Sequence, residues 1–394
     1  MRAVVVVGAS LAGLRAAEGL RAQGFTGTLT VVGDEPHPPY DRPPLSKQVL
    51  TAAETPPVTR LPQAEALNAD WRLGSAAVGL DLDARAVTLA DGDRVPYDGL
   101  VIATGSAARE WPGEQPPPPG VITLRGWDDA LELRTRLEPG RRLVVIGAGF
   151  LGGEIAAAAR ARDVDVTLVE AAAQPLERAV GAAVGAYIAA LHRQAGIDLR
   201  TGSTVSGFHT GPDGRLSGVE LSDGSTLSAD TAVLALGAVP STGWLAGSGL
   251  RLEGGVHCDT RLRALRDDGS VAEGVVAAGD VARVPHRLAG GERLALGHWT
   301  NAVEQGAAAA ATLLAPGTAE PFTAVPSFWS DLYGARIRSV GLPSAADEAR
   351  VVEYDLARRR LEVGYHRAGR LVGALTIGRT GRLASYRGAL QEAA

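Results

Sequence analysis

The hydrophobic positions of the chain repeat one arrangement twice. The apolar runs Val4–Val7 and Leu143–Ile146 predict strands that are buried on both faces. Each run stops at a glycine, and an alanine-rich segment with helical spacing follows, then a second apolar run. The two copies span Ala3–Glu35 and Arg142–Ala172. Alternating strands and helices predict an α/β fold with parallel sheets.

The glycines after each first strand have the spacing of a dinucleotide-binding turn. The second copy has Gly147, Gly149 and Gly152, whereas the first has Gly8, Ser10 and Gly13, with serine in the middle position. Such a turn lets the backbone and a helix N-terminus approach a pyrophosphate.

An acidic residue about 20 residues further on accepts hydrogen bonds from a ribose hydroxyl. In the first copy, Asp34 stands at this position with Glu35 as its neighbour, and in the second copy Glu170 does. Two such copies predict two bound dinucleotides.

The remainder of each copy also matches the other. The turns Asp91-Gly92 and Asp223-Gly224 predict hairpins. A buried strand and a glycine follow each of them, and "EGVVAAGDVAR", Glu273–Arg283, closes another strand on Gly279-Asp280.

These patterns predict three domains. The first consists of residues 1–110 and 238–320, the second of residues 111–237, and the third of residues 321–394, where alternating polar and apolar positions predict antiparallel strands. The expected architecture is therefore α/β, with two Rossmann-like domains of three-layer ββα type and a small C-terminal α+β domain.

Composition narrows the function classes. The 394 residues are 45% hydrophobic and 21% charged, as in ordinary globular proteins, and the net charge of −5 argues against nucleic acid as a partner. The lone Cys258 excludes an intramolecular disulfide and a CxxC pair, and we expect a buried structural thiol and no metal site. The apolar run at the N-terminus is too short for a signal peptide, and no membrane span is expected, so we expect a reducing, cytoplasmic setting.

One short segment places a single lysine with unusual rigidity. "PPYDRPPLSKQVL", Pro38–Leu50, crowds prolines around Tyr40, Asp41 and Arg42 and then reaches Lys47. Prolines restrict the unfolded chain, so the lysine is fixed at little entropic cost. The alternative is a solvated surface lysine.

Together, "YDRPPLSK", "ATGS", "AAGD", "WTNAVEQG" and "FWSDLYG" resemble the FAD-dependent NAD(P)H:ferredoxin reductases of the glutathione-reductase-like superfamily, which serve Rieske-type oxygenases and cytochromes P450. The resemblance implies FAD in the first domain, NADH in the second, and a C-terminal domain that covers the flavin.

The resemblance also implies roles for individual residues. Arg42 would pair with the FAD pyrophosphate, Asp280 would bind the ribityl chain, and Ala77 would meet the adenine. The full set of implied cofactor contacts is Gly8, Ser10, Ala12, Gly13, Asp34, Glu35, Arg42, Lys47, Ala77, Thr104, Gly105, Arg125, Gly147, Gly149, Gly152, Glu154, Glu170, Gly237, Gly279, Asp280, Trp299 and Trp329. The two tryptophans would shield the flavin, with core packing as the alternative.

Lys47 and Glu154 are the candidate catalytic residues. The resemblance places Lys47 beside the reactive edge of the flavin and Glu154 near the nicotinamide, where it would contact Lys47 when NADH binds. Glu170 predicts NADH over NADPH, because a carboxylate accepts bonds from the ribose hydroxyls and repels a 2′-phosphate, and no arginine follows it before Arg178.

The resemblance implies hydride transfer from NADH to FAD, then single electrons to a [2Fe-2S] ferredoxin that feeds an oxygenase. The segment Tyr40–Lys47 contains no redox cysteine, so the electrons leave to an external acceptor. Binding of the acidic ferredoxin would be transient, and the candidate docking residues are Arg283, His286, Arg287, Arg293, Arg336 and Arg338. The protein would be a monomer or a homodimer. The alternatives are a reductase of rubredoxin or another one-electron carrier, and an NADH-sensing flavoprotein like the apoptosis-inducing factor.

Overall fold

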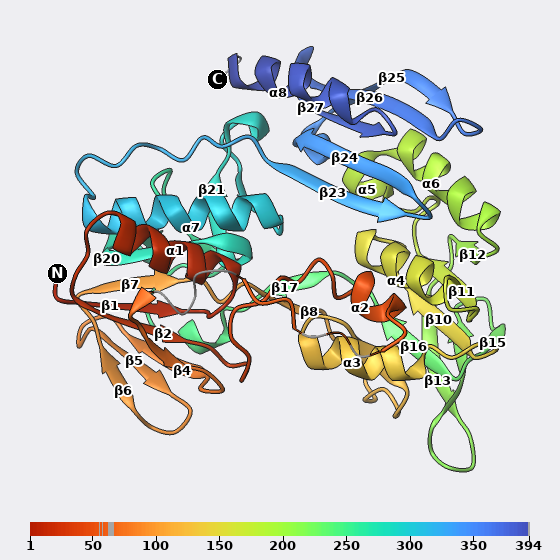
Figure 1. Ribbon diagram of the computed structural model, residues 1–394, viewed down its shortest axis with the longest axis horizontal. Helices are drawn as coiled ribbons and strands as arrows, with labels where there is room; N and C mark the ends of the chain where they lie inside the picture. The colour runs from red at the N-terminus through yellow and green to blue at the C-terminus, as the bar shows by residue number, and fades with distance from the viewer. Residues whose placement is uncertain (55, 57, 62–66, 393–394) are drawn as a thin grey trace. The chain divides into compact units, whose positions relative to one another are not determined.

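A computed structural model describes residues 1–54, 56, 58–61 and 67–392, and the chain forms two compact units (Figure 1). Unit 1 consists of Met1–Asp41, Thr59–Ala107 and Val239–Phe328, and unit 2 of Arg42–Val58, Ala108–Ala238 and Trp329–Ala394. Each unit contains one copy of the internal repeat. The assignment of one cofactor to residues 1–110 and 238–320 and of another to 111–237 stays a prediction.

Unit 1 is built on a six-stranded sheet with the order β19-β20-β7-β1-β2-β3. Its strands are β1 (Ala3–Val7), β2 (Thr28–Val32), β3 (Asp70–Arg72), β7 (Gly99–Ile102), β19 (Arg263–Leu265) and β20 (Val271–Ala277). The strand β1 runs parallel to both β2 and β7, and its residues Val4–Val7 are almost fully buried, as its unbroken apolar run predicts.

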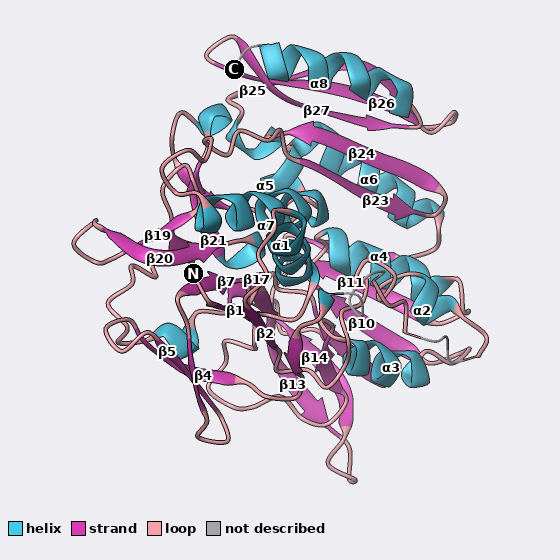
Figure 2. Ribbon diagram, turned by 60° about the vertical axis from the view of Figure 1, so that its left-hand side comes forward, coloured by secondary structure: helices cyan, strands magenta, loops and turns pink. Residues whose placement is uncertain are grey.

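Two helices of unit 1, α1 (Leu11–Ala22) and α7 (Trp299–Leu314), lie side by side in both ribbon views (Figures 1 and 2). Small residues allow this close approach. A Cβ built at Gly306 would lie 2.5 Å from the carbonyl oxygen of Ala12, and one at Gly19 would lie 2.9 Å from the Cβ of Ala310. The alanine-rich composition of these helices therefore serves packing.

The remaining elements of unit 1 are short. One three-stranded sheet contains β4 (Ala77–Asp81), β5 (Ala86–Leu89) and β6 (Arg94–Pro96), and β5 and β6 pair as the antiparallel hairpin predicted around Asp91-Gly92. Another contains β18 (Val256–His257), β21 (Ala282–Pro285) and β22 (Arg293–Ala295), with 3-10 turns at Gly243–Leu245, Gly279–Val281 and Arg287–Ala289. The chain crosses between the units at β8 (Ser106–Ala108) and β17 (Ala238–Pro240).

Unit 2 repeats the parallel arrangement in a five-stranded sheet with the order β12-β11-β10-β16-β9. Its strands are β9 (Val121–Thr123), β10 (Arg142–Ile146), β11 (Asp165–Glu170), β12 (Asp198–Thr201) and β16 (Thr231–Leu234). The unit's first five helices are α2 (Gln48–Thr51), α3 (Trp127–Arg136), α4 (Phe150–Arg160), α5 (Glu177–Val180) and α6 (Ala182–Gln194). A separate antiparallel sheet contains β13 (Val205–Thr210), β14 (Leu216–Leu221) and β15 (Thr226–Ser228).

The C-terminal part of unit 2 is an antiparallel sheet with the order β23-β24-β27-β26-β25. Its strands are β23 (Ser327–Leu332), β24 (Ala335–Gly341), β25 (Glu348–Asp355), β26 (Arg360–Arg367) and β27 (Arg370–Ile377). Helix α8 (Leu383–Glu392) packs against β24 and β27, and 3-10 turns occur at Pro343–Ala345 and Thr380–Arg382. The antiparallel pairing of β25, β26 and β27 confirms the antiparallel strands that the alternating polar and apolar positions predict.

Polar contacts attach this C-terminal sheet to the helices of the same unit. The Tyr365 hydroxyl donates to the carbonyl of Val180 at 2.7 Å. His192, fully buried on α6, lies with its Nδ1 2.7 Å from the hydroxyl of Tyr333, at the turn between β23 and β24. The C-terminal sheet and residues 108–238 therefore belong to one compact unit.

The first turns of the two repeats have the same backbone geometry. The amide of Gly8 donates to Val32, and that of Gly147 donates to Val169, both at 2.8 Å. A Cβ at Gly8 would lie 2.1 Å from the carbonyl oxygen of Ala103, and a Cβ at Gly147 would lie 2.4 Å from that of Ala235. Both glycines have positive φ, 120° and 106°, so only glycine fits there without strain.

The middle position of the turn is different. A Cβ at Gly149 would meet no described atom within 4 Å, and the corresponding residue in unit 1, Ser10, carries its side chain on an extended backbone with φ −114°. The serine that departs from the glycine pattern therefore occupies a position where folding does not require glycine.

We expect Gly147→Ala and Gly149→Ala to differ sharply in stability. The first introduces a clash with a carbonyl at positive φ and should cost about 3 kcal/mol or more. The second should cost less than about 1 kcal/mol. Thermal unfolding followed by circular dichroism compares them, and equal melting temperatures would contradict the strained-turn account.

The buried His192 should make the stability of unit 2 fall in mild acid. Burial lowers the pKa of His192 from 6.5 to about 4, so between these values the unfolded chain binds a proton that the folded chain does not. Its contribution is full above pH 6.5 and is lost as the pH falls, by about 2 kcal/mol from pH 7 to pH 5.

We expect His192→Gln to remove this part of the pH dependence. The melting temperature of the variant should fall about 5 °C less than that of the parent protein between pH 7 and pH 5. Parallel falls in the two proteins would show that His192 is protonated as easily when folded as when unfolded.

Candidate functional site

The turn at the start of α1 offers a phosphate-binding geometry in unit 1. A Cβ at Gly13 would lie 1.8 Å from the carbonyl oxygen of Gly8, so the helix begins directly against the end of β1. The first N–H groups of a helix have no partner within it, and the positive end of the helix dipole lies there. Because glycines leave the backbone without side chains at this turn, a pyrophosphate could approach the N–H groups, so the residues present fit a dinucleotide.

The corresponding turn of unit 2 has the same geometry. A Cβ at Gly152 would lie 1.9 Å from the carbonyl oxygen of Gly147, and the space beside Gly149 is open. Helix α4 begins at Phe150, directly after this turn. The residues of unit 2 therefore also fit a pyrophosphate.

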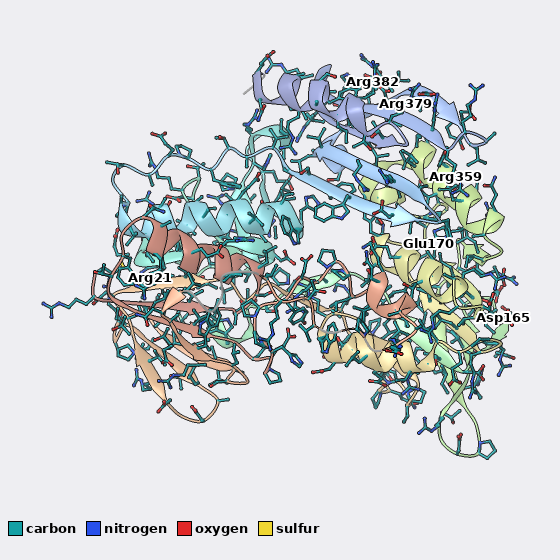
Figure 3. All side chains as sticks on the ribbon, in the orientation of Figure 1. Arg21, Asp165, Glu170, Arg359, Arg379 and Arg382 are labelled. Atoms are coloured by element: carbon teal, nitrogen blue, oxygen red, sulfur yellow. The ribbon has the colours of Figure 1, made fainter. Side chains whose placement is uncertain are left out.

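Glu170, labelled in Figure 3, ends β11 beside this turn. Its carboxylate accepts hydrogen bonds from two backbone N–H groups. The backbone N–H of Ala148 donates to Oε2 and that of Ala172 donates to Oε1, both at 2.8 Å. A carboxylate has about four lone-pair positions, so each oxygen keeps one for a further donor. The arrangement can accept two hydroxyl groups from a ribose.

The acids of the first repeat are placed differently from Glu170. The matching register of the two turns puts Gly33, rather than an acid, at the position of Glu170. A Cβ at Gly33 would lie 2.6 Å from the Cβ of Ala9. Asp34 is exposed, and Glu35 is half-buried and accepts a 2.5 Å bond from the hydroxyl of Tyr40.

The structure brings several predicted residues of unit 1 together. A Cβ at Gly279 would lie 2.8 Å from the Cβ of Ala12, so the Gly279-Asp280 turn packs closely against helix α1. Asp280 accepts a 2.8 Å bond from the hydroxyl of Ser106, a residue that the sequence did not single out. The role of these residues toward a cofactor stays a prediction.

Other predicted residues of unit 1 have structural contacts of their own. The indole of Trp299 donates to Asp41 at 2.7 Å, and the hydroxyl of Thr104 donates to the carbonyl of Ser241 at 2.8 Å. Ala77 begins β4 and lies opposite Leu89. Gly105 has positive φ, at 67°.

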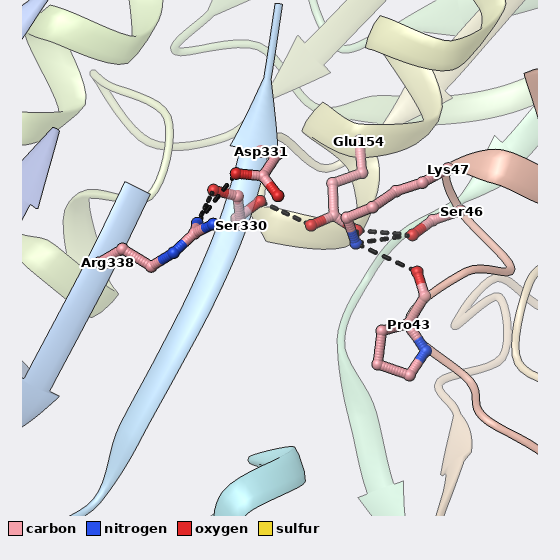
Figure 4. A network of polar contacts seen from close by, with 7 residues as sticks. All are labelled: Pro43, Ser46, Lys47, Glu154, Ser330, Asp331 and Arg338. Carbon is pink, nitrogen blue, oxygen red and sulfur yellow. Dashed lines mark hydrogen bonds and ion pairs between the residues drawn. The ribbon is translucent and has the colours of Figure 1, made fainter. Parts of the chain in front are cut away.

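In unit 2, Lys47 of the proline-rich segment forms an ion pair with Glu154 (Figure 4). The Lys47 Nζ lies 2.6 Å from Oε2 of Glu154, and the exposed fractions of the two side chains are 19% and 8%. Lys47 also donates to the carbonyl of Pro43 at 3.2 Å. Lys47 and Glu154 therefore form an ion pair, and Lys47 is not a solvated surface lysine.

Two serines complete the surroundings of Glu154, and the sequence did not single out either of them. The hydroxyl of Ser46 donates to Oε2 at 2.5 Å, and that of Ser330, on β23, donates to Oε1 at 2.6 Å. Ser46 directly precedes Lys47, and Ser330 lies inside "FWSDLYG". The sequence signal that could have indicated these two serines is their position inside the motifs "YDRPPLSK" and "FWSDLYG".

The remaining predicted residues of unit 2 are Arg42, Arg125, Gly237 and Trp329. The Arg42 guanidinium donates to the backbone carbonyl of Arg125 at 2.8 Å, which brings these two residues together. Trp329 is half-buried on β23, next to Ser330. Gly237 has positive φ, at 97°, directly before β17.

Most of the candidate docking arginines are engaged within the fold. Arg283 donates to the carbonyls of Glu253 and Arg293, and Arg293 donates to that of Cys258. Arg338 pairs with Asp331. His286 caps the 3-10 turn that begins at Arg287, whereas Arg336 on β24 is exposed.

Three further arginines of the C-terminal region, labelled in Figure 3, are engaged as well: Arg359 donates to the Tyr333 carbonyl, Arg379 pairs with Glu353, and Arg382 pairs with the buried Glu362.

Cys258 is fully buried, and burial raises the pKa of its thiol, which confirms the expected buried thiol. Within the described ranges, no group of three histidine, cysteine or acidic side chains is placed to hold a metal ion. No helix in that part of the chain is long and apolar enough to cross a membrane.

Comparison with known proteins agrees with this geometry. Rhodocoxin reductase of Rhodococcus erythropolis is 37% identical over 87% of this chain and 79% of its own length. Putidaredoxin reductase of Pseudomonas putida is 34% identical over 95% of this chain and 88% of its own length. The crystal structure of a covalent putidaredoxin reductase–putidaredoxin complex superimposes with a TM-score of 0.90 at 32% identity, covering 99% of this chain and 93% of the solved one.

Two family descriptions together cover nearly the whole chain. Residues 327–394 match the family described as reductase C-terminal, and residues 2–306 match that described as pyridine nucleotide-disulphide oxidoreductase. The resemblance seen in the motifs is thereby confirmed, and the chain belongs to the pyridine nucleotide-disulphide oxidoreductase family.

Proposed function

We propose that this protein is an NADH-dependent ferredoxin reductase, which passes a hydride from NADH to FAD and then single electrons to a [2Fe-2S] ferredoxin that feeds an oxygenase. The observation that carries the proposal is the matched geometry of the two glycine turns, one in each unit, since two such turns accommodate two dinucleotides.

The names of relatives support this choice of reaction. The ferredoxin–NAD(+) reductase subunit of the benzene 1,2-dioxygenase system of Pseudomonas putida is 36% identical over 86% of this chain. The solved complex contains a reductase of this kind linked to putidaredoxin.

In unit 1, Gly8, Ser10 and Gly13 would hold the diphosphate of FAD on the start of α1. Asp280, already held by Ser106, would bind the ribityl chain. When bound, a flavin accepts two electrons together and releases them one at a time, which a nicotinamide cannot do. The protein's part is to bind, to orient and to exclude water.

In unit 2, the turn from Gly147 to Gly152 would hold the pyrophosphate of NADH. The Glu170 carboxylate would accept the 2′- and 3′-hydroxyls of the adenosine ribose. The N–H groups of Ala148 and Ala172 already fix this carboxylate, so little reorganisation is needed on binding. Its charge repels the 2′-phosphate of NADPH.

Lys47 would supply a positive charge beside the reactive edge of the flavin, with Glu154 near the nicotinamide. Their ion pair is largely buried, so its electrostatic effect is stronger than that of a pair in water. The segment Tyr40–Lys47 carries no cysteine and Cys258 is buried, so the electrons leave to an external carrier.

We place this chemistry in the cytoplasm.

Mixing experiments test the proposed reaction. Anaerobic NADH should bleach the flavin absorbance of the purified protein, and a [2Fe-2S] ferredoxin added next should be reduced while the flavin absorbance returns. A protein that is bleached but reduces rubredoxin and not ferredoxin would support the rubredoxin alternative. A stable NADH-bleached complex that reduces neither carrier would support the sensor alternative and contradict the reductase proposal.

Replacing Glu170 should change the choice of nicotinamide nucleotide. Glu170→Gln removes the charge and one acceptor, at a cost of about 2 kcal/mol in NADH binding, or roughly 30-fold in KM. The preference for NADH over NADPH, as kcat/KM, should fall by at least this factor.

Asp165→Asn provides the matched control, because Asp165 is an exposed acid at the other end of the same strand β11. It should leave the preference unchanged. If Glu170→Gln kept the full preference for NADH, this residue would not select the nucleotide.

A further inference from the structure

The C-terminal sheet reaches the candidate catalytic pair through the side chain of Ser330 (Figure 4). Ser330 lies on β23 and is fully buried. Its hydroxyl donates to Oε1 of Glu154, on helix α4, at 2.6 Å. Both residues belong to unit 2, and 176 positions separate them in the chain.

Glu154 depends on such donors because its carboxylate has been taken out of water. Oε2 receives the hydroxyl of Ser46 and the ammonium of Lys47, at 2.5 and 2.6 Å. On Oε1, the donor recorded in the described residues is Ser330. A buried charge is costly unless its oxygens are hydrogen-bonded, so each donor constrains where the carboxylate can lie.

Ser330 is itself held in place by its neighbours. The Arg338 guanidinium on β24 donates to the Ser330 carbonyl at 3.2 Å and to Asp331 at 2.9 Å. The turn that joins β23 to β24 carries Tyr333, whose hydroxyl contacts the buried His192 of α6 at 2.7 Å. The strand is therefore fixed at the serine and at the turn that follows it, and the hydroxyl has a defined position relative to α4.

We propose that Ser330 is a positioning residue for the Lys47–Glu154 pair: its hydrogen bond to Oε1 fixes the rotation of the Glu154 carboxylate, which presents Oε2 to Lys47 and so fixes the lysine. The C-terminal sheet thus takes part in the reactive site as well as packing against the unit. The catalytic consequence rests on the proposed function of Lys47 and Glu154.

Removal of the hydroxyl should loosen the pair. In Ser330→Ala, Oε1 becomes a buried acceptor without its donor, so the carboxylate turns toward other donors and Lys47 loses a fixed partner. Ser330→Thr keeps a hydroxyl on the same carbon and should retain the contact. Neither change touches the glycine turns or Glu170, so binding of either dinucleotide should be preserved.

The chain offers a matched control on the neighbouring strand. Ser339, on β24, is also buried, and its hydroxyl donates to the carbonyl of Ala374 at 3.1 Å, within the same sheet. Ser339→Ala therefore removes a buried hydroxyl hydrogen bond without touching Glu154. It measures the purely structural cost of such a loss.

The first readout does not depend on turnover. The purified protein is treated briefly with an amine-selective acylating reagent, and modification of Lys47 is measured by mass spectrometry. Ser330→Ala should raise the rate of modification at Lys47 about 5-fold, and Ser330→Thr and Ser339→Ala should leave it within about 2-fold of the parent. Equal rates in Ser330→Ala and Ser339→Ala would overturn the proposal.

The second readout is the rate of flavin reduction at saturating NADH. Ser330→Ala should lower it about 10-fold without changing the dissociation constant of NADH, and Ser330→Thr should restore it. In a Glu154→Gln background, Ser330→Ala should cause little further loss, because the two residues act through one carboxylate. Additive losses would show that Ser330 acts independently of Glu154 and would overturn the proposal.

The two readouts separate the possible failures. If NADH did not reduce the flavin of the parent protein, the proposed function would fail, but the modification of Lys47 would still decide whether Ser330 positions it. If Glu154→Gln lowered the rate and Ser330→Ala changed neither readout, the proposed function would survive and the role of Ser330 would not.

Discussion

The close approach of two backbone segments at each glycine turn is the constraint on which the rest of the structure depends. At Gly8 and at Gly147, a Cβ would lie within 2.4 Å of the carbonyl oxygen of the residue that directly follows the neighbouring strand. This contact lets the first strand pass directly into a helix, so the helix N-terminus is presented at the end of the parallel sheet. Gly149 and Ser10 are free of this constraint, which explains why the repeat tolerates a serine there.

The repeat, its two sheets and the antiparallel C-terminal strands could all be predicted from the sequence. They depend on local features, namely runs of apolar residues, glycine positions and alternation, which remain visible in a single chain. The proline-rich segment also indicated a fixed lysine. The partner Glu154 was suggested only by a family resemblance, because a contact between residues 47 and 154 leaves no periodic pattern in the sequence.

The donors to Glu154 show why the remainder of the site could not be predicted. Ser330 and Glu154 come from a sheet and a helix that are far apart in the chain, and the motif "FWSDLYG" does not indicate which residue the Ser330 hydroxyl contacts. The acids of the first repeat show a second limit. Asp34 and Glu35 stand one and two positions beyond the place of Glu170, since the Ala9 side chain leaves room for only a glycine at residue 33.

Several of the arginines suggested as docking residues are engaged within the fold. Arg283, Arg293 and Arg338, which sequence position suggested as docking residues, donate to carbonyls or pair with an acid within their own units. A count of arginines along the sequence cannot separate such structural cations from those that face solvent. Arg336, exposed on β24, remains the candidate of this set with an open surface position.

The stoichiometry of bound dinucleotides shows whether each glycine turn accommodates one dinucleotide. The flavin released by denaturing a known amount of purified protein would be measured by absorbance, and NAD⁺ binding to the intact protein by titration calorimetry. The account predicts one FAD and one nicotinamide nucleotide per chain, bound independently. A chain that carried only one dinucleotide, or for which NAD⁺ displaced FAD, would contradict it.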